Sequence, residues 1–137
     1  MGDKVYTGEA EYQRELVLVL EYYKLKVQVH NDVGWPSVPD LSFSGYGTDG
    51  WIEVKYLPLG MVRCPSDIGH FTEGQKNWLN RHGKVGSGHC YLLVGSPGDH
   101  QILRYGDWGK MKFAEKGHPT VGAVGCALKN LLINING

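Results

Sequence analysis

Apolar residues recur every three or four positions near the start of the chain, where residues 9–24 carry Leu16, Leu20 and Tyr23. This spacing predicts an amphipathic helix. The glutamates of its first turn suit the positive end of the helix dipole. A similar apolar pattern over residues 121–135 predicts a last helix, packed either on the sheet or on a partner chain.

Two further helices are expected from their start signals. Thr72 is a good N-cap residue, and the helix after it should run to about His82 and end at Gly83. Asp107 is placed to cap a short helix towards Glu115.

Strand patterns fill much of the remaining chain. Residues 26–30 alternate polar and apolar side chains, which predicts a strand, and residues 31–37 form a loop with Gly34 and Pro36. Residues 90–94 are a continuous apolar run between glycines, typical of a buried strand. Residues 101–105 should return beside it as a second arm of a hairpin.

The central hairpin is predicted from residues 41–43 and 51–56, which are rich in aromatic and β-branched side chains. We place its turn on Asp49-Gly50, a dipeptide that accepts positive φ. The connection covers residues 44–49, which leaves the register open by a residue or two. Side chains alternate across a strand, so Glu53 and Lys55 share one face. The apolar residues between and beside them share the other face and suit a core.

Composition narrows the class of protein. The chain of 137 residues is expected to be a single domain over residues 1–137, with 42% apolar and 20% charged residues, which excludes disorder. Its core should cover about residues 9–95, and a hairpin with a helical extension should cover about residues 96–137. We see no segment that would span a membrane and no signal peptide, so a cytosolic location is the expectation, in the host cell for a viral protein.

Charge and cysteines exclude little more. The net charge is zero, from 14 basic and 14 acidic residues, which counts mildly against a strong non-specific nucleic-acid binder. The three cysteines are widely spaced and predict neither a disulfide framework nor a zinc site.

Asp40 and Glu53 are the candidate chemistry of the central hairpin. A hairpin that brings two carboxylates together leaves them repelling each other unless a cation neutralises them. Oxygen ligands of this kind suit a hard divalent ion such as Mg²⁺. Lys55 could then orient a water molecule or offset negative charge on a phosphate.

The sequence Pro39-Asp40, twelve residues, then Glu53-Val54-Lys55 resembles the PD-(D/E)XK nuclease motif. The resemblance implies Mg²⁺ or Mn²⁺ bound by Asp40, Glu53 and the Val54 carbonyl, with Lys55 as the catalytic lysine. It also implies an α/β fold, a mixed central sheet with helices on both faces and a restriction-endonuclease-like αβββαβ core.

Two neighbouring elements extend the resemblance. Gln75, Trp78 and Leu79 form a Q-x-x-W-L helix similar to that of virus-type replication-repair (VRR-NUC) nucleases and Holliday junction resolvases, which implies that Gln75 points towards Lys55 or the attacking water. A first-helix glutamate completes the metal site in such nucleases. Glu9 fits that position best, with Glu11 and Glu15 as the alternatives.

The resemblance implies a nucleic-acid substrate, with DNA favoured over RNA and branched or structured DNA favoured over plain duplex. A resolvase would act as a homodimer. Four basic residues after the E-x-K strand are candidate phosphate contacts: Arg63, Lys76, Arg81 and Lys84.

Two other hypotheses remain open at the level of sequence. The chain could be a non-catalytic nucleic-acid-binding or inhibitor module that keeps the nuclease fold. It could also be a small metal protein that uses His70, His89, Cys64 and Cys90, although their spacing matches no zinc motif.

Overall fold

The structure is a computed structural model that describes residues 3–30 and 36–135, and in these residues one mixed sheet has the strand order β1-β2-β3-β4-β5. Its strands are β1 Lys26–Val29, β2 Leu41–Gly45, β3 Thr48–Tyr56, β4 Cys90–Ser96 and β5 Asp99–Arg104. Neighbouring strands are antiparallel except for β3 and β4, which are parallel and are joined through a crossover helix.

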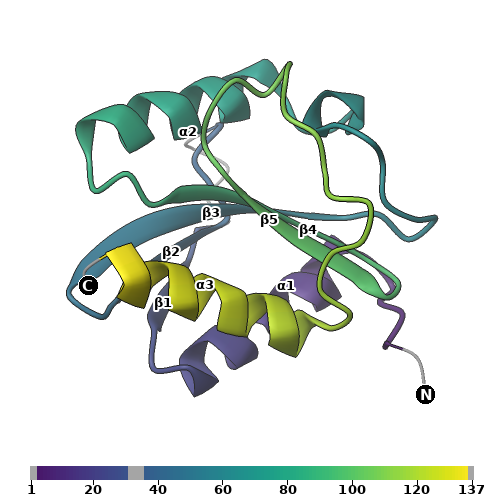
Figure 1. Cartoon of the computed structure of the whole chain (residues 1–137), viewed down its shortest axis with the longest axis horizontal. Coiled ribbons are helices and arrows are strands. Elements are labelled where there is room, and N and C mark those ends of the chain that lie inside the picture. The colour runs from purple at the N-terminus through teal and green to yellow at the C-terminus, as the bar shows by residue number, and fades with distance from the viewer. Residues whose placement is uncertain (1–2, 31–35, 136–137) are drawn as a thin grey trace.

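Helices cover both faces of the sheet (Figure 1). The first and last helices, α1 (Glu9–Tyr22) and α3 (Val121–Ile135), lie against each other on one face. The crossover helix α2 (Glu73–Val85) lies on the other face, preceded by the 3-10 turn η1 (Pro65–Asp67). The predicted mixed α/β fold with an αβββαβ core is therefore confirmed. In the part of the chain that is described, no helix is long and apolar enough to cross a membrane.

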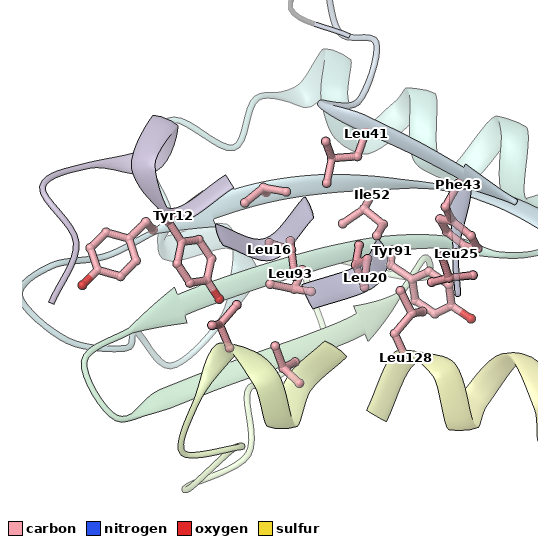
Figure 2. Close-up of a cluster of buried hydrophobic side chains, with 14 of the residues drawn as sticks. Tyr12, Leu16, Leu20, Leu25, Leu41, Phe43, Ile52, Tyr91, Leu93 and Leu128 are labelled. Atoms are coloured by element: carbon pink, nitrogen blue, oxygen red, sulfur yellow. The ribbon is translucent and has the colours of Figure 1, made fainter. Parts of the chain in front are cut away.

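Most of the core lies between the sheet and the pair α1 and α3 (Figure 2). Tyr12, Leu16 and Leu20 of α1 are fully buried there, as the helical spacing predicts. The apolar face of β3 packs against them, so the predicted alternation along this strand is confirmed. Leu128 of α3 closes the same cluster, and the last helix therefore uses its apolar face within the domain.

A smaller apolar cluster lies under α2. Leu79 of the helix packs on Leu92 and Val94 of β4, and Trp108 and Phe113 from the segment after β5 close its edge. Glu53 and Lys55 point to this same face of the sheet, so a partly apolar environment surrounds both charges. Their burial follows from that position.

The central hairpin turns at Tyr46-Gly47 rather than at the predicted Asp49-Gly50. Both turn residues have positive φ, 54° and 79°, as a two-residue hairpin loop requires. Gly50 serves another purpose within β3, because a Cβ there would lie 2.1 Å from the carbonyl oxygen of His89. The glycine therefore marks a close backbone approach instead of a turn.

The predicted end of α2 at Gly83 is also wrong. The helix continues to Val85, and Gly86 occupies its C-cap. A Cβ on Gly83 would lie 2.3 Å from the ring of Tyr105, so this glycine allows the helix to pack closely on the segment after β5. The start of the helix is as predicted, with the Thr72 side chain accepting a hydrogen bond from the Gln75 N–H.

The helix predicted from Asp107 to Glu115 does not form. Only one turn follows Asp107, after which the chain is held by contacts from elsewhere. The Phe113 N–H donates to the Arg63 carbonyl, and the Gln101 side chain pairs with both backbone groups of Ala114. The predicted 31–37 loop lies mostly outside the described residues.

A buried polar chain fastens the segment before α1 to the second hairpin. His100 of β5 is fully buried, with its Nε2 lying 2.5 Å from the Asp3 carboxylate and its Nδ1 lying 2.7 Å from the Tyr12 hydroxyl. Tyr6 continues the connection, because its N–H donates to the hydroxyl of Tyr56 in β3. The amino-terminal residues are therefore part of the packed domain.

Candidate active site

Two carboxylates occupy the edge of β3 where its pairing with β2 ends. The last paired residues are Leu41 and Ile52, and beyond them the β3 backbone needs other acceptors. Asp40 accepts from the Val54 N–H at 2.9 Å. Glu9 of α1 accepts from the Tyr56 N–H at 3.2 Å. Two N–H groups of β3, those of Val54 and Tyr56, therefore fix both acids.

Glu53 and Lys55 form a buried ion pair beside this edge. The Lys55 ammonium lies 3.1 Å from Glu53 Oε2, and both side chains are more than nine-tenths buried. The ammonium also donates to the His70 carbonyl at 2.8 Å. Glu53 Oε1 has no hydrogen-bond partner although it is buried, which leaves one acceptor oxygen unsatisfied.

Buried Glu53 and half-buried Asp40 hold protons more tightly than ordinary carboxyls. Burial, followed by repulsion from Asp40, raises the pKa of Glu53 to about 7, against the attraction of Lys55. Burial also raises the pKa of Asp40, although its hydrogen bond from Val54 opposes the shift. Glu53 is thus poised to exchange a proton for a cation near neutral pH.

These residues line one cleft of about 730 Å³, which we call the acid cleft. It brings together six predicted site residues: Glu9, Asp40, Glu53, Val54, Lys55 and Gln75. The rest of its wall comes from α1 and β1, with Gln13, Arg14, Leu18 and Val29 among the lining residues. Neither Glu11 nor Glu15 lines the cleft, so Glu9 is the first-helix glutamate at this site.

Gln75 caps its own helix and also lines the acid cleft. Its side-chain oxygen accepts from the Thr72 N–H at 2.9 Å, which completes a capping box at the start of α2. The same side chain faces the acid cleft, where its amide NH₂ is a donor.

His70 is the residue that sequence reasoning did not select. Its carbonyl holds Lys55, and its Nε2 donates to Glu9 Oε1 at 3.0 Å. One residue therefore contacts two candidate catalytic groups that are distant in sequence. No local signal marks this role, because His70 lies in a loop before α2 and both contacts are long-range.

The four predicted phosphate contacts do not line the acid cleft. Lys76 and Lys84 line a separate cleft along α2, where Lys76 pairs with Glu73 at 3.3 Å. Arg63 and Arg81 are exposed. Besides Lys55, Arg14 of α1 is a basic residue that lines the acid cleft.

The carboxylates of the acid cleft supply part of the oxygen ligand set that a hard divalent cation takes. Among the described residues, no three His, Cys, Asp or Glu side chains form a ready metal group. Asp40 and Glu53 are nevertheless adjacent, mutually repelling carboxylates, and Glu53 Oε1 is an unsatisfied acceptor. A cation between them would satisfy that oxygen and relieve the repulsion. The residues therefore fit a magnesium-type ion with two side-chain ligands.

The zinc hypothesis does not fit the described residues, because its four candidates form no metal-binding group among them. His89 is hydrogen-bonded to the Tyr91 hydroxyl at 2.7 Å, and His70 is engaged with Glu9. Burial raises the pKa of the Cys90 thiol to about 11, which disfavours the thiolate that zinc requires.

A solved structure has a similar arrangement of strands and helices. Hjc, a Holliday junction resolvase from the archaeal hyperthermophile Archaeoglobus fulgidus, superposes with a TM-score of 0.56 over 93% of this chain and 99% of its own. The two chains share one fold. Their sequences are 14% identical, so the likeness to Hjc is a likeness of fold. No family model and no curated protein matches the sequence.

Proposed function

We propose that the chain is a metal-dependent nuclease that hydrolyses phosphodiester bonds, with branched or structured DNA as its substrate. The carrying observation is the acid cleft, where the buried Glu53 and the half-buried Asp40, an unsatisfied oxygen and a buried lysine meet at the end of a strand pair. The fold shared with Hjc supports a nuclease of the PD-(D/E)XK type. The nearer likeness to VRR-NUC nucleases rests on the Gln75 helix alone.

Asp40, Glu53 and the Val54 carbonyl would hold Mg²⁺ or Mn²⁺. When bound, such an ion polarises a phosphoryl oxygen and lowers the pKa of a coordinated water. Glu9 is anchored to Tyr56 and His70 and lines the same cleft, so it contributes charge beside the ligands.

Lys55 is arranged to act on the phosphate or on the attacking water. An ammonium has three N–H donors, and Glu53 and the His70 carbonyl engage two of them. The third remains for an oxygen in the cleft, where a fixed positive charge stabilises the charge that develops in the transition state. Gln75 offers its amide NH₂ to a second oxygen, because its carbonyl is held by the capping box.

The choice of substrate follows from the neighbour's chemistry. Hjc is described as a Holliday junction resolvase, so a four-way DNA junction is the first substrate to test. A symmetric junction is cut at two equivalent sites, and the active form would then be a homodimer. Arg14, together with Arg63, Lys76, Arg81 and Lys84, would contact the phosphates of the arms.

Cleavage of a labelled panel tests the proposal. The panel holds single-stranded, duplex, flap and four-way-junction DNA with matched RNA, each incubated with Mg²⁺, Mn²⁺ or EDTA. We expect metal-dependent cutting of DNA, strongest on the junction, and at least a thousandfold loss in Lys55→Ala. Lys55→Met keeps the volume of the side chain and should be equally inactive while retaining the native circular dichroism spectrum.

Equal cutting by wild type and both Lys55 variants would refute the assignment of the site. Binding to the panel without cleavage under any metal would instead favour the non-catalytic nucleic-acid-binding module. Preferential cleavage of RNA would overturn the choice of DNA.

A further inference from the structure

A second surface begins where the acid cleft ends. Helix α2 covers β4 and its neighbours, whereas the same face of β1 and β2 carries no helix among the described residues. A groove of about 530 Å³ runs over this face, and we call it the sheet groove. Polar and apolar residues both line it: Lys26, Gln28, Ser42, Ser44 and Asp49 together with Val27, Phe43 and Trp51.

A row of four aromatic rings, which we call the ladder, extends from Trp51 in the sheet groove to helix α2. The rings of His30 and Trp51 have centroids 5.0 Å apart, and Trp51 meets Trp78 of α2 edge to face at 4.9 Å. His82 stacks on Trp78 at 3.6 Å with an angle of 10° between the rings. All four rings are only partly buried, so the ladder keeps apolar ring surface in contact with solvent.

The sheet groove and the acid cleft lie on the same strands. Ser42 is two residues after Asp40 on β2, and Trp51 is two residues before Glu53 on β3, so strand alternation puts all four side chains on one face. His30 joins the two sites as well, because its N–H donates to the Asp40 carbonyl and its Nε2 bonds the Ser42 hydroxyl. A ligand bound at Ser42 and Trp51 in the groove would therefore lie only two residues along each strand from Asp40 and Glu53.

The chemistry of the groove suits one unpaired nucleic-acid strand. Aromatic rings offer stacking surfaces for bases irrespective of sequence, which requires a base that is not stacked in a duplex. Hydroxyl and amide side chains such as Ser42, Ser44 and Gln28 pair with phosphate oxygens and base edges, and Lys26 adds positive charge. The centre of a protein–protein interface is depleted in charged residues, whereas Lys26 and Asp49 are among the residues that line this groove.

We propose that the sheet groove binds the unpaired DNA strand next to the scissile phosphate, with the pair Trp51 and Trp78 as a stacking platform for one of its bases. This inference rests on the proposed function and names the part of a branched substrate that the site selects. Junctions, flaps and gaps expose such nucleotides, while a continuous duplex does not.

The first test uses the full chain in EDTA, so that no cleavage occurs, with an oligodeoxythymidine as the probe. Binding should quench tryptophan fluorescence and raise the anisotropy of a labelled oligonucleotide. Gln28→Glu keeps the size of an exposed side chain and adds a negative charge to the floor, so affinity should fall about fivefold. The matched control is Asn130→Asp, exposed on α3 across the sheet, which should bind as wild type.

A second pair of variants tests the rings themselves. Trp51→Ala should weaken oligonucleotide binding tenfold or more, because a stacked base loses its platform. Trp51→Phe keeps a ring and should restore most of the affinity. Trp108→Phe removes a buried tryptophan from the α2 cluster and should leave both the affinity and the quenching unchanged.

Wild-type affinity in both Gln28→Glu and Trp51→Ala would overturn the inference, even if Trp51→Ala is less stable, because Gln28 carries no buried contact. Failure of the two proposals is distinguishable. If the protein cleaves none of the substrates and Gln28→Glu still lowers the oligonucleotide affinity, only the proposed nuclease activity is refuted. Junction cleavage that is unaffected by both variants would refute only the groove.

Discussion

The Lys55 ammonium and the His70 carbonyl oxygen lie 2.8 Å apart, although the two residues are separated by the whole loop before α2. The His70 side chain meanwhile holds Glu9 at 3.0 Å. The backbone of one loop residue therefore orients the lysine and its side chain orients an acid, which makes His70 a positioning residue in the proposed site.

We expect His70→Ala to lower kcat about tenfold and to leave KM for a junction nearly unchanged. The variant keeps the carbonyl that holds Lys55 and loses only the bond to Glu9. His70→Gln should recover part of the rate, because an amide nitrogen can still donate to Glu9 Oε1. Steady-state kinetics of the three proteins provides the measurement.

A double-mutant cycle separates this role from a general loss of structure. If His70 acts through Glu9, the Glu9→Gln substitution should cost much less in the His70→Ala protein than in wild type. Fully additive losses would mean that the two side chains act independently.

Stability should fall with rising pH because of Glu53. Its carboxyl has an ordinary pKa of 4.5 and a folded pKa of about 7, so the folded state binds more protons between these values. The free energy of unfolding should therefore decrease from about pH 4.5 to about pH 7, by roughly 1–3 kcal/mol, and level off above. Urea denaturation in EDTA at pH 5, 6, 7 and 8 measures it.

Asp40→Asn is the matched variant for this pH dependence. Repulsion from Asp40 is the second cause of the raised pKa, after burial, so its removal should bring the Glu53 pKa closer to 4.5. The loss of stability should then be smaller and end at lower pH. An unchanged profile would point to other titrating groups.

Divalent ions should stabilise the protein at pH 8 far more than at pH 5.5. Metal binding requires ionised carboxylates, and the Glu53 carboxyl is largely protonated below its pKa of about 7. At pH 8 we expect Mg²⁺ or Mn²⁺ to raise Tm in proportion to the logarithm of its concentration above Kd. Glu53→Gln should show no such rise at either pH. Differential scanning fluorimetry against matched metal-free and EDTA samples checks both expectations.

Tyr12→Phe should destabilise the fold by about 1–3 kcal/mol, since it leaves the fully buried Nδ1 of His100 without its partner. The hydroxyl of Tyr22, by contrast, belongs to a side chain that is 76% exposed, and Tyr22→Phe should change stability by less than about 0.5 kcal/mol. Equal effects of the two substitutions in urea denaturation would show that the buried bond contributes little.

Sequence periodicity and capping signals predicted the helices and strands because these depend on local rules, whereas the fold and the residues of the acid cleft were implied by the resemblance to the PD-(D/E)XK motif. The alternation along β3 put Glu53 and Lys55 on one face, and the capping signal at Thr72 set the start of α2. Two glycines led to wrong predictions, one for the hairpin turn and one for the end of α2. Gly50 and Gly83 are required by close packing against other segments, which the sequence around them does not reveal.

The remaining site features arise from contacts between distant segments. The bonds of His70 to Glu9 and Lys55 join three separate elements, and no residue spacing encodes them. The same holds for the ladder of Trp51 and Trp78, which combines a strand with a helix. Sequence patterns thus identify the acids and the lysine, whereas the tertiary structure identifies what positions them.

The connection of the first residues to β5 has a practical consequence for any shortened form of the protein. Asp3 holds His100, and Tyr6 reaches Tyr56, whose own N–H anchors Glu9 in the acid cleft. A chain that began at Glu9 would keep every helix and strand, yet it would lose both attachments. Truncation from this end is therefore a way to loosen the glutamate of the proposed site from a distance, and an affinity tag belongs at the other terminus.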